Sequence, residues 1–235
     1  MEHVGRVRRD FDELALLPEE SWDHNVHYHD WLLRHLPPHL GRVLEIGCGT
    51  GRFSRRLAER AERVLAVDVS PVMIRVAHER SKRFGNVRFH LADASTWTYP
   101  YEEFDCAVSI ATLHHLPLEQ ALVGMRDAVR PGGTVFALDL YEPTNPADRL
   151  WDAVALPASA LLRLARTGRS RPAPAVRELW RRHGEHDVYP RFDRVLRACA
   201  HGLPGATVKR HLFWRYSAVW TKPAPAAECF GRDRR

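Results

Sequence analysis

The stretch VLEIGCGTGR, residues 43–52, decides the fold of this 235-residue chain. A short apolar run typical of a buried strand ends in three glycines at alternate positions, and a segment with helical spacing, 53–62, comes next. Glycines at such a turn let the backbone reverse sharply and let a ligand approach without meeting a Cβ atom. The stretch therefore predicts a strand, a ligand-binding loop and a helix in direct succession.

The same alternation of apolar runs and helical segments continues downstream. The expected strands are 43–46, 64–68, 87–91, 105–109 and 134–139, and the expected helices are 53–62, 71–84 and 118–128. A Pro-Gly-Gly turn at 131–133 separates the last helix from the fifth strand. Two further runs, 206–213 and 216–221, are expected to pair around Trp214-Arg215, which gives seven strands. The pattern predicts an α/β fold with a mostly parallel sheet and helices on both faces.

Five regions follow from this pattern. Residues 1–40 are expected to form an N-terminal helical cap with a helix at 21–36, and residues 41–141 the core. Prolines interrupt arginine-rich helical pieces after the core, so 142–190 is predicted to be an inserted helical lid. Residues 191–222 then supply a C-terminal helix and the closing strands, and 223–235 a disordered tail.

Composition favours one soluble globular core. Hydrophobic residues make up 45% of the chain and charged residues 27%. The N-terminal 20 residues lack the apolar run of a secretory signal, and no segment holds the ~18 apolar residues of a membrane span, so we expect a cytoplasmic protein. The four cysteines are far apart and form no Cys-x-x-Cys pair, which predicts neither a disulfide framework nor a metal site.

The formal charge of +6 is concentrated in a few places. One cluster of arginines falls between residues 166 and 182, and another ends the chain. We interpret these runs as solvated surface, because no aromatic platform or RNA-binding signature accompanies them, and nucleic acid is not the expected partner. The sequence carries no signal for an oligomeric state.

Glu45 and Arg52 argue against a dinucleotide site in the glycine loop. Dinucleotide-binding enzymes place a third glycine or an alanine where this chain has Arg52. Glu45 adds negative charge near a position where a pyrophosphate would be repelled but a sulfonium or ammonium group would be attracted. An NAD-dependent oxidoreductase is therefore disfavoured.

At this point the sequence resembles the class I methyltransferases that use S-adenosylmethionine (SAM), whose signature loop is Glu/Asp-x-Gly-x-Gly-x-Gly after the first strand. The similarity continues in order through Asp68, Asp93, the segment 104–116 and the Pro-Gly-Gly turn, over roughly residues 40 to 140. It implies a Rossmann-like sheet with SAM at its carboxyl edge. Asp68 is then expected to bind the ribose hydroxyls and Asp93 to lie near the adenine, although each could instead only stabilise its own turn.

The resemblance implies a set of cofactor-binding residues drawn from successive strand ends. They are Glu45, Gly47, Cys48, Gly49, Gly51, Asp68, Val69, Met73, Asp93, Ala94, Ser109, Ile110, His114 and, from the N-terminal helix, Tyr28.

Methyl transfer from a sulfonium is an in-line displacement, so alignment and exclusion of water supply most of the catalysis. A general base helps when the acceptor is a hydroxyl. His114, His115 and Tyr28 are the candidate catalytic residues, with His24 and Glu142 also in range, and the histidine pair could alternatively serve only to pack on the cofactor. The loop after the fourth strand, Ser-Ile-Ala-Thr, lacks the Asn/Asp-Pro-Pro-Tyr/Phe pattern of amino-methylating enzymes that act on nucleobases and glutamine.

The expected function is methylation of a small, partly apolar acceptor, as in natural-product or lipid-quinone tailoring. Two rivals stay open. A methyltransferase acting on RNA or a peptide would use the arginines of 166–182, and a non-catalytic protein would bind SAM without turnover. The sequence does not distinguish methylation at oxygen, nitrogen, carbon or sulfur.

Overall fold

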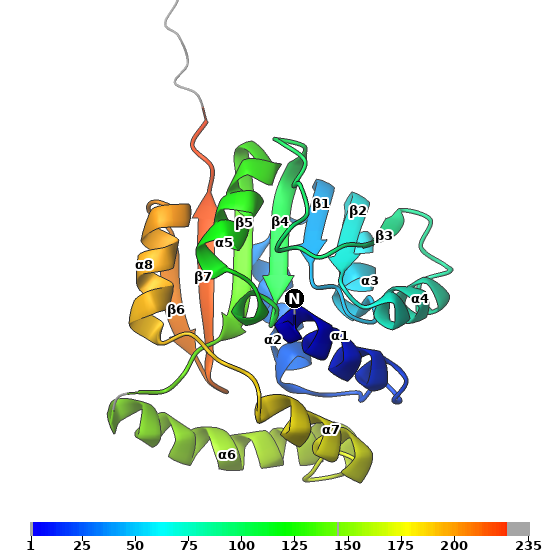
Figure 1. Ribbon diagram of the computed structural model, residues 1–235, viewed down its shortest axis with the longest axis vertical. Coiled ribbons are helices and arrows are strands. Elements are labelled where there is room, and N and C mark those ends of the chain that lie inside the picture. Colours follow the sequence, from blue (N-terminus) through cyan, green and yellow to red (C-terminus); the bar gives the residue numbers. More distant parts are fainter. Residues whose placement is uncertain (1, 145, 225–235) are drawn as a thin grey trace, which may run out of the picture.

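A computed structural model describes residues 2–144 and 146–224, with a seven-stranded sheet at its centre (Figure 1). The sheet order is β3-β2-β1-β4-β5-β7-β6. The strands are β1 (Leu40–Ile46), β2 (Ala61–Asp68), β3 (Val87–Leu91), β4 (Phe104–Ile110), β5 (Val129–Leu140), β6 (Thr207–His211) and β7 (Arg215–Thr221). β7 is antiparallel to both β5 and β6, and the other neighbouring strands are parallel. The predicted seven-stranded, mostly parallel sheet is confirmed.

Helices cover both faces of this sheet (Figure 1). They are α1 (Glu2–Ala15), α2 (His24–His35), α3 (Arg52–Ala58), α4 (Pro71–Arg80), α5 (Leu118–Ala128), α6 (Pro146–Thr167), α7 (Pro174–Gly184) and α8 (Phe192–Gly202), with a short 3-10 turn at Leu113–His115. Apolar side chains of α5 and α8 share one core with the sheet. Those of α2 and α3 share a second core on the opposite face.

Several helices are shorter than their sequence patterns indicated. The helix expected at 53–62 ends at Ala58, because residues 61–63 already pair with β1, and Leu40 N–H donates to the Arg60 carbonyl at 2.9 Å. The helix expected at 71–84 ends at Arg80, and Ser70 caps its start by accepting from Met73 N–H. The helix expected at 21–36 begins at His24, one residue after its capping residue.

Two turns also differ from expectation. The Pro-Gly-Gly segment 131–133 lies inside β5 and does not precede it. β5 pairs with β4 first at Val129 and Phe104, and then, after a register shift, from Thr134 and Cys106 onward. The run expected at 206–213 ends at His211, since Phe213 and Trp214 have φ angles of 62° and 57° that no strand adopts. Arg215 is therefore the first residue of β7.

The N-terminal and inserted segments cover the carboxyl edge of the sheet. α1 contacts α4 and α7, and Ser70 Oγ at the start of α4 donates to Asp12 Oδ1 at 2.5 Å. The insertion consists of α6 and α7, as predicted for helical pieces, while its role as a lid stays a prediction. The predicted disordered tail lies outside the described residues from 225 onward. No helix in the described ranges has the length and apolar character needed to cross a membrane.

Asp23 is a testable determinant of this N-terminal arrangement. Its Oδ1 accepts from Asn25 N–H at 2.7 Å and from Val26 N–H at 2.8 Å, at the start of α2. Asp23→Ala should lower the free energy of unfolding by about 1 kcal/mol, because two backbone donors lose their acceptor. Urea denaturation measures the change, and Asp23→Asn, which can still cap, should lose much less. Equal losses in the two variants would contradict the capping role.

Candidate functional site

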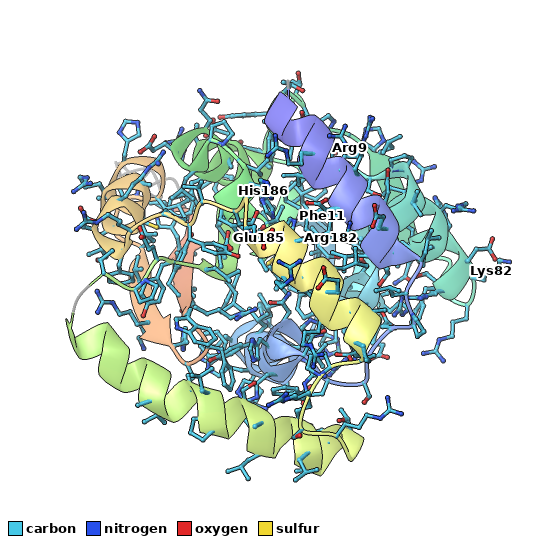
Figure 2. The ribbon with its side chains drawn as sticks, turned by 60° about the horizontal axis from the view of Figure 1, so that its bottom comes forward. Arg9, Phe11, Lys82, Arg182, Glu185 and His186 are labelled. Carbon is cyan, nitrogen blue, oxygen red and sulfur yellow. The ribbon has the colours of Figure 1, made fainter. Side chains whose placement is uncertain are left out.

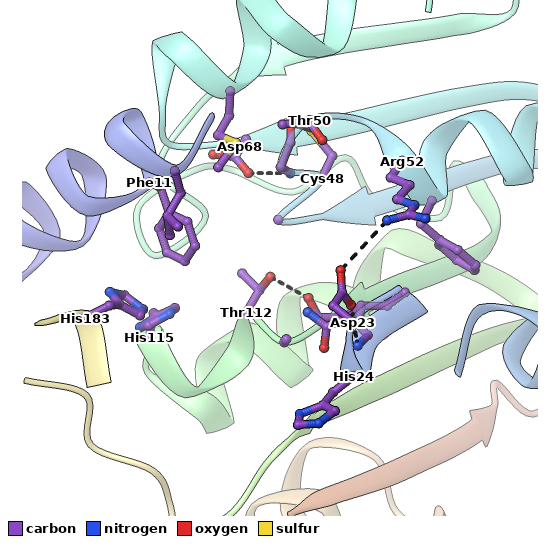
Figure 3. Close-up of a pocket in the computed structure, with 18 of the residues that line it drawn as sticks. Phe11, Asp23, His24, Cys48, Thr50, Arg52, Asp68, Thr112, His115 and His183 are labelled. Atoms are coloured by element: carbon purple, nitrogen blue, oxygen red, sulfur yellow. Dashed lines mark hydrogen bonds and ion pairs between the residues drawn. The ribbon is translucent and has the colours of Figure 1, made fainter. Parts of the chain in front are cut away.

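A cavity of about 600 Å³ lies at the carboxyl edge of the parallel strands (Figure 3). Residues that follow β1, β2, β3 and β4 form its floor, and α1 and α7 form its roof. Figure 3 shows Asp68 and Cys48 on one side of this space and Phe11, His115 and His183 on another. The cavity therefore joins the glycine loop to the histidine-bearing loop after β4.

The glycine loop needs its glycines for two different reasons. Gly47 has a φ of 76°, and a Cβ atom there would overlap the side chain of Thr112, which comes from the loop after β4. Gly49 has a φ of 52° and borders the cavity. The backbone at Gly49 therefore faces open space that a ligand can occupy.

Asp68 lies at the end of β2, at the position where the resemblance predicts a residue that binds the ribose of SAM. Its Oδ2 accepts from Gly49 N–H at 2.8 Å and its Oδ1 from Ser70 N–H at 2.9 Å. Burial raises the pKa of Asp68, although the backbone hydrogen bonds from Ser70, Gly49 and Val69 oppose that shift. The carboxylate is thus held at the edge of the cavity by both the glycine loop and the start of α4.

Asp93 lines the cavity beyond β3, together with Ala92 and Ala94. Its Oδ1 accepts from Ser95 N–H at 2.9 Å and from Ser95 Oγ at 2.6 Å. Asp93 thus stabilises its own turn and borders the cavity, so its adenine contact stays a prediction.

Glu45 is 2% exposed and borders the same cavity. Its Oε2 accepts from Ser54 Oγ at 2.5 Å. Burial raises the pKa of Glu45 to about 8, and the nearby Asp68 carboxylate acts in the same direction. The carboxyl group therefore keeps its proton at neutral pH until a cation enters the cavity.

His114 is fixed by a buried carboxylate at the end of β5. Asp139 is 1% exposed, and its Oδ1 lies 2.6 Å from His114 Nδ1 while its Oδ2 accepts from His114 N–H at 2.8 Å. With a proton on Nδ1 donated to this carboxylate, Nε2 is left as the acceptor nitrogen of the neutral ring. His114 lines the cavity, so this carboxylate fixes the orientation of a ring that borders the ligand space.

A second cluster, formed by His115, His183, Asp187 and Asp10, ties the roof to the floor. His183 lies between two carboxylates, with Nδ1 3.0 Å from Asp10 Oδ2 and Nε2 3.1 Å from Asp187 Oδ2. Burial alone would lower the pKa of His183, but Asp187 and Asp10 outweigh it and raise that pKa. Burial lowers the pKa of His115 to about 3, so this ring stays neutral. The cluster links α1, α7 and the loop after β4 across the cavity.

The same region holds a possible metal-ligand set that the sequence did not indicate. One ligand atom each from His114, His115 and Asp187 lie within 4.8 Å of one another. Imidazole and carboxylate are suitable donors for a metal such as zinc. However, Asp187 already accepts from the Tyr189 hydroxyl at 3.0 Å and faces His183. We therefore interpret the cluster as a hydrogen-bonded network, and the absence of a metal stays a prediction.

The structure brings most of the expected cofactor residues to the cavity but not all of them. The expected residues that line it are Glu45, Gly47, Cys48, Gly49, Asp68, Val69, Met73, Asp93, Ala94, Ile110, His114 and His115. Ser109, Gly51 and Tyr28 are not among the lining residues. Ser109 Oγ instead donates to the Ile46 carbonyl at 3.0 Å within the sheet, and a Cβ on Gly51 would meet Phe89 and Ala77.

Tyr28 was expected both in catalysis and at the cofactor, but it faces a different part of the molecule. Its hydroxyl donates to the Leu212 carbonyl at 2.9 Å, and its ring belongs to the core between α2 and the sheet. Of the two secondary candidates, His24 lines the cavity. Glu142 is exposed, and its backbone forms an isolated parallel β-bridge with Arg191.

Sequence reasoning missed the roof residues and the partner of His114. Phe11, His183 and Asp187 come from segments outside the resemblance, and no spacing links them to the loop after β4. Asp139 could have been found, because it ends a strand that neighbours β4 in the sheet. A carboxylate at that edge lies beside the residues that follow β4.

The residues present fit an adenosyl cofactor. Asp68 and Asp93 lie on the cavity at successive strand ends, and the open backbone of Gly49 lies between the first of them and Glu45. A buried carboxyl group beside the cavity suits the ammonium and sulfonium charges of SAM.

Comparison with known proteins agrees with this site. Residues 43–133 match the family model described as a methyltransferase domain. An uncharacterized methyltransferase of Mycobacterium tuberculosis strain H37Rv is 31% identical over 211 residues, which cover 87% of this chain and 99% of the relative. A demethylmenaquinone methyltransferase of Tropheryma whipplei is 26% identical over 170 residues, covering 68% of this chain and 71% of the relative. The structure of the DhpI complex with S-adenosylhomocysteine (SAH) shares the fold, with a TM-score of 0.60 and 22% identity. The match covers 95% of this chain and 96% of the DhpI chain.

Removal of the Asp68 carboxylate tests the ribose assignment. Asp68→Ala should weaken SAM and SAH binding by about 1–3 kcal/mol, because donors on the ligand lose their acceptor. Isothermal titration calorimetry gives the dissociation constants, with NAD as a ligand that should not bind. The SAH affinity of Asp93→Ala is measured in parallel. Unchanged SAH affinity in Asp68→Ala would rule out the ribose role.

Glu45 should make the stability of the ligand-free protein fall as pH rises. The unfolded chain releases this proton near pH 4.5 and the folded chain only near pH 8, so between these values the unfolded state binds fewer protons and is favoured. Glu45→Gln should abolish this contribution, about 3–4 kcal/mol between pH 5 and pH 8. Urea denaturation at both pH values measures it. The same pH dependence in wild type and Glu45→Gln would show that Glu45 does not hold a shifted proton.

Proposed function

The chain belongs to the class I SAM-dependent methyltransferases, and from this premise we propose that it methylates a small, largely apolar acceptor from which His114 removes a proton. The observation that carries the proposal is the buried Asp139 carboxylate, 2.6 Å from His114 Nδ1 on the wall of the cavity. An imidazole that only packed on the cofactor would not need a carboxylate to fix its orientation. Buried and paired, Asp139 also stabilises the imidazolium that forms when His114 takes a proton.

SAM, when bound, supplies an electrophilic methyl group on a positively charged sulfur. Glu45, Gly49, Asp68 and Asp93 would hold it along the strand ends, and the acceptor would then lie toward His114. His114 Nε2 would accept the hydroxyl proton of the acceptor. The transfer would form one bond, from the acceptor to the methyl carbon, and break one, from that carbon to sulfur, whose electron pair would stay on the sulfur of SAH; a ring carbon that received the methyl group would then lose its own proton. The ring nitrogen later returns the proton to solvent.

The chemistry of the cavity wall favours an apolar acceptor. Phe11 from α1 and Val176 and Trp180 from α7 line the roof, and Tyr189 and Trp214 lie on the cavity as well. Such walls exclude water from the reacting atoms and bind an aromatic or aliphatic molecule. The similarity to a demethylmenaquinone methyltransferase supports an acceptor of the quinol type.

A macromolecular acceptor is the second candidate, because several arginines of 166–182 are exposed. Against it, Arg181 pairs with Glu178 and Glu185, and Arg182 pairs with Glu13, so part of this charge is already neutralised. Binding of RNA through the remaining arginines would weaken steeply with added salt. A titration of a short RNA at 50 mM and 200 mM salt therefore separates the two candidates.

The proposal predicts separate effects on binding and turnover. With a short-chain demethylmenaquinol as acceptor and radiolabelled SAM, wild-type protein should form methylated product and SAH. His114→Gln should lower kcat by about 10²–10⁴-fold, because the base is lost, while SAH affinity changes little. Asp139→Asn should lower kcat in the same direction, since it no longer fixes the ring.

His78→Gln, on the exposed side of α4, is the matched control and should keep full activity. Wild-type turnover in His114→Gln would contradict the role of His114. SAH binding without turnover of any acceptor in a panel of quinols, phenols and amines would favour a non-catalytic SAM-binding protein.

A further inference from the structure

The outer face of α6 is apolar, although it faces solvent. Residues 153–162 read AVALPASALL and contain no charged side chain. Val154, Leu156, Leu161 and Leu164 are 52%, 61%, 65% and 48% exposed. Figures 1 and 2 show α6 along the margin of the molecule, away from the sheet. Several large apolar side chains on one surface helix form a patch of the kind that marks an interaction site.

The polar side chains of this part of α6 point inward instead. Arg163 is 8% exposed, and its Nη1 donates to Glu20 Oε2 at 2.6 Å while its guanidinium lies over the ring of Trp22. Ser159 Oγ lies 2.8 Å from His24 Nε2. Ala155 is buried, and Ala158 and Leu162 pack against the core, so α6 is apolar on its inner side as well as on its outer side. An ordinary surface helix exposes charges opposite its apolar stripe, whereas this part of α6 exposes leucines that pack into neither core of the described residues.

Exposed arginines follow the apolar run of α6 in the chain. Arg166, Arg169 and Arg171 are exposed, and no ion pair joins them to any residue within the described ranges 2–144 and 146–224. No aspartate or glutamate occurs between Ala153 and Arg177. The patch thus combines exposed leucines with uncompensated positive charge.

We propose that α6 lies in the surface of an anionic lipid bilayer, with its leucines among the acyl chains and the arginines of 166–171 on the headgroups. Helices with one apolar face and neighbouring arginines bind in this manner. A second copy of the chain is a poorer partner. In a two-fold interface each segment 153–177 would face the same segment of the other copy, which contains no aspartate or glutamate, so the arginines would lack counter-charges.

Membrane docking would place the cavity beside the lipid. Arg163 on the inner side of α6 lines the cavity, and so do Pro172 and Val176, which follow the arginines of 166–171 in the chain. An acceptor dissolved in the bilayer could then reach the catalytic cavity without crossing water. This last step rests on the proposed function, whereas the docking itself does not.

Vesicle co-sedimentation of the full chain tests the docking. Wild-type protein should bind vesicles of phosphatidylglycerol mixed with phosphatidylcholine, and bind pure phosphatidylcholine more weakly. Leu161→Ser and Leu164→Ser should each reduce the partition coefficient by about ten-fold, since each removes an inserted side chain. Leu196→Ser, on α8 with 44% exposure, is the matched control and should leave binding unchanged.

SAH binding by each variant verifies that it is folded, and light scattering reports its oligomeric state. No binding of wild type to phosphatidylglycerol vesicles, or equal binding by Leu161→Ser and Leu196→Ser, would overturn the proposal. A dimer that dissociates in Leu164→Ser without vesicle binding would overturn it in favour of a second copy. Because none of these measurements uses turnover, failure here leaves the methylation proposal intact, and loss of turnover leaves the docking intact.

Discussion

The contact between Gly47 and Thr112 is the constraint on which the site depends. Thr112 occupies the space that a Cβ atom on Gly47 would take, so the loops after β1 and β4 pack directly together. One loop leads through Gly49 to the Asp68 carboxylate, and the other leads to His114 and its partner Asp139. This close approach makes the part of the cavity beside Asp68 and the part beside His114 one continuous space.

The roof over this space is held by buried charge. His183 bridges Asp10 on α1 and Asp187 after α7, and Arg163 of α6 pairs with Glu20. A buried ion is costly unless it is paired and hydrogen-bonded, so these pairs specify how the N-terminal segment meets the insertion. Because Arg163 turns toward the protein, the exposed side of α6 carries leucines. The pair that helps to hold the roof of the cavity therefore also leaves exposed the apolar surface on which the docking proposal rests.

The core of the site was predictable because it follows from periodicity and from parallel-sheet geometry. Asp68, Asp93 and His114 come directly after strands, and the carboxyl ends of parallel strands meet at one edge. Tyr28 and Ser109 do not line the cavity, for a related reason. Sequence position placed them near that edge, but side-chain direction turned Tyr28 toward Leu212 and Ser109 toward Ile46.

By itself, the sequence determined the seven strands, the glycine loop and the order of the strand-end residues that line the cavity. Each depends on local spacing, within residues 40–140 for the first five strands and within 206–221 for the closing pair. Only the tertiary structure decided which groups cover that edge and which face of α6 points outward. The pairs His183–Asp10 and Arg163–Glu20 join residues 173 and 143 positions apart. No repeat or spacing in the chain encodes such contacts, because they form only when separate elements pack together.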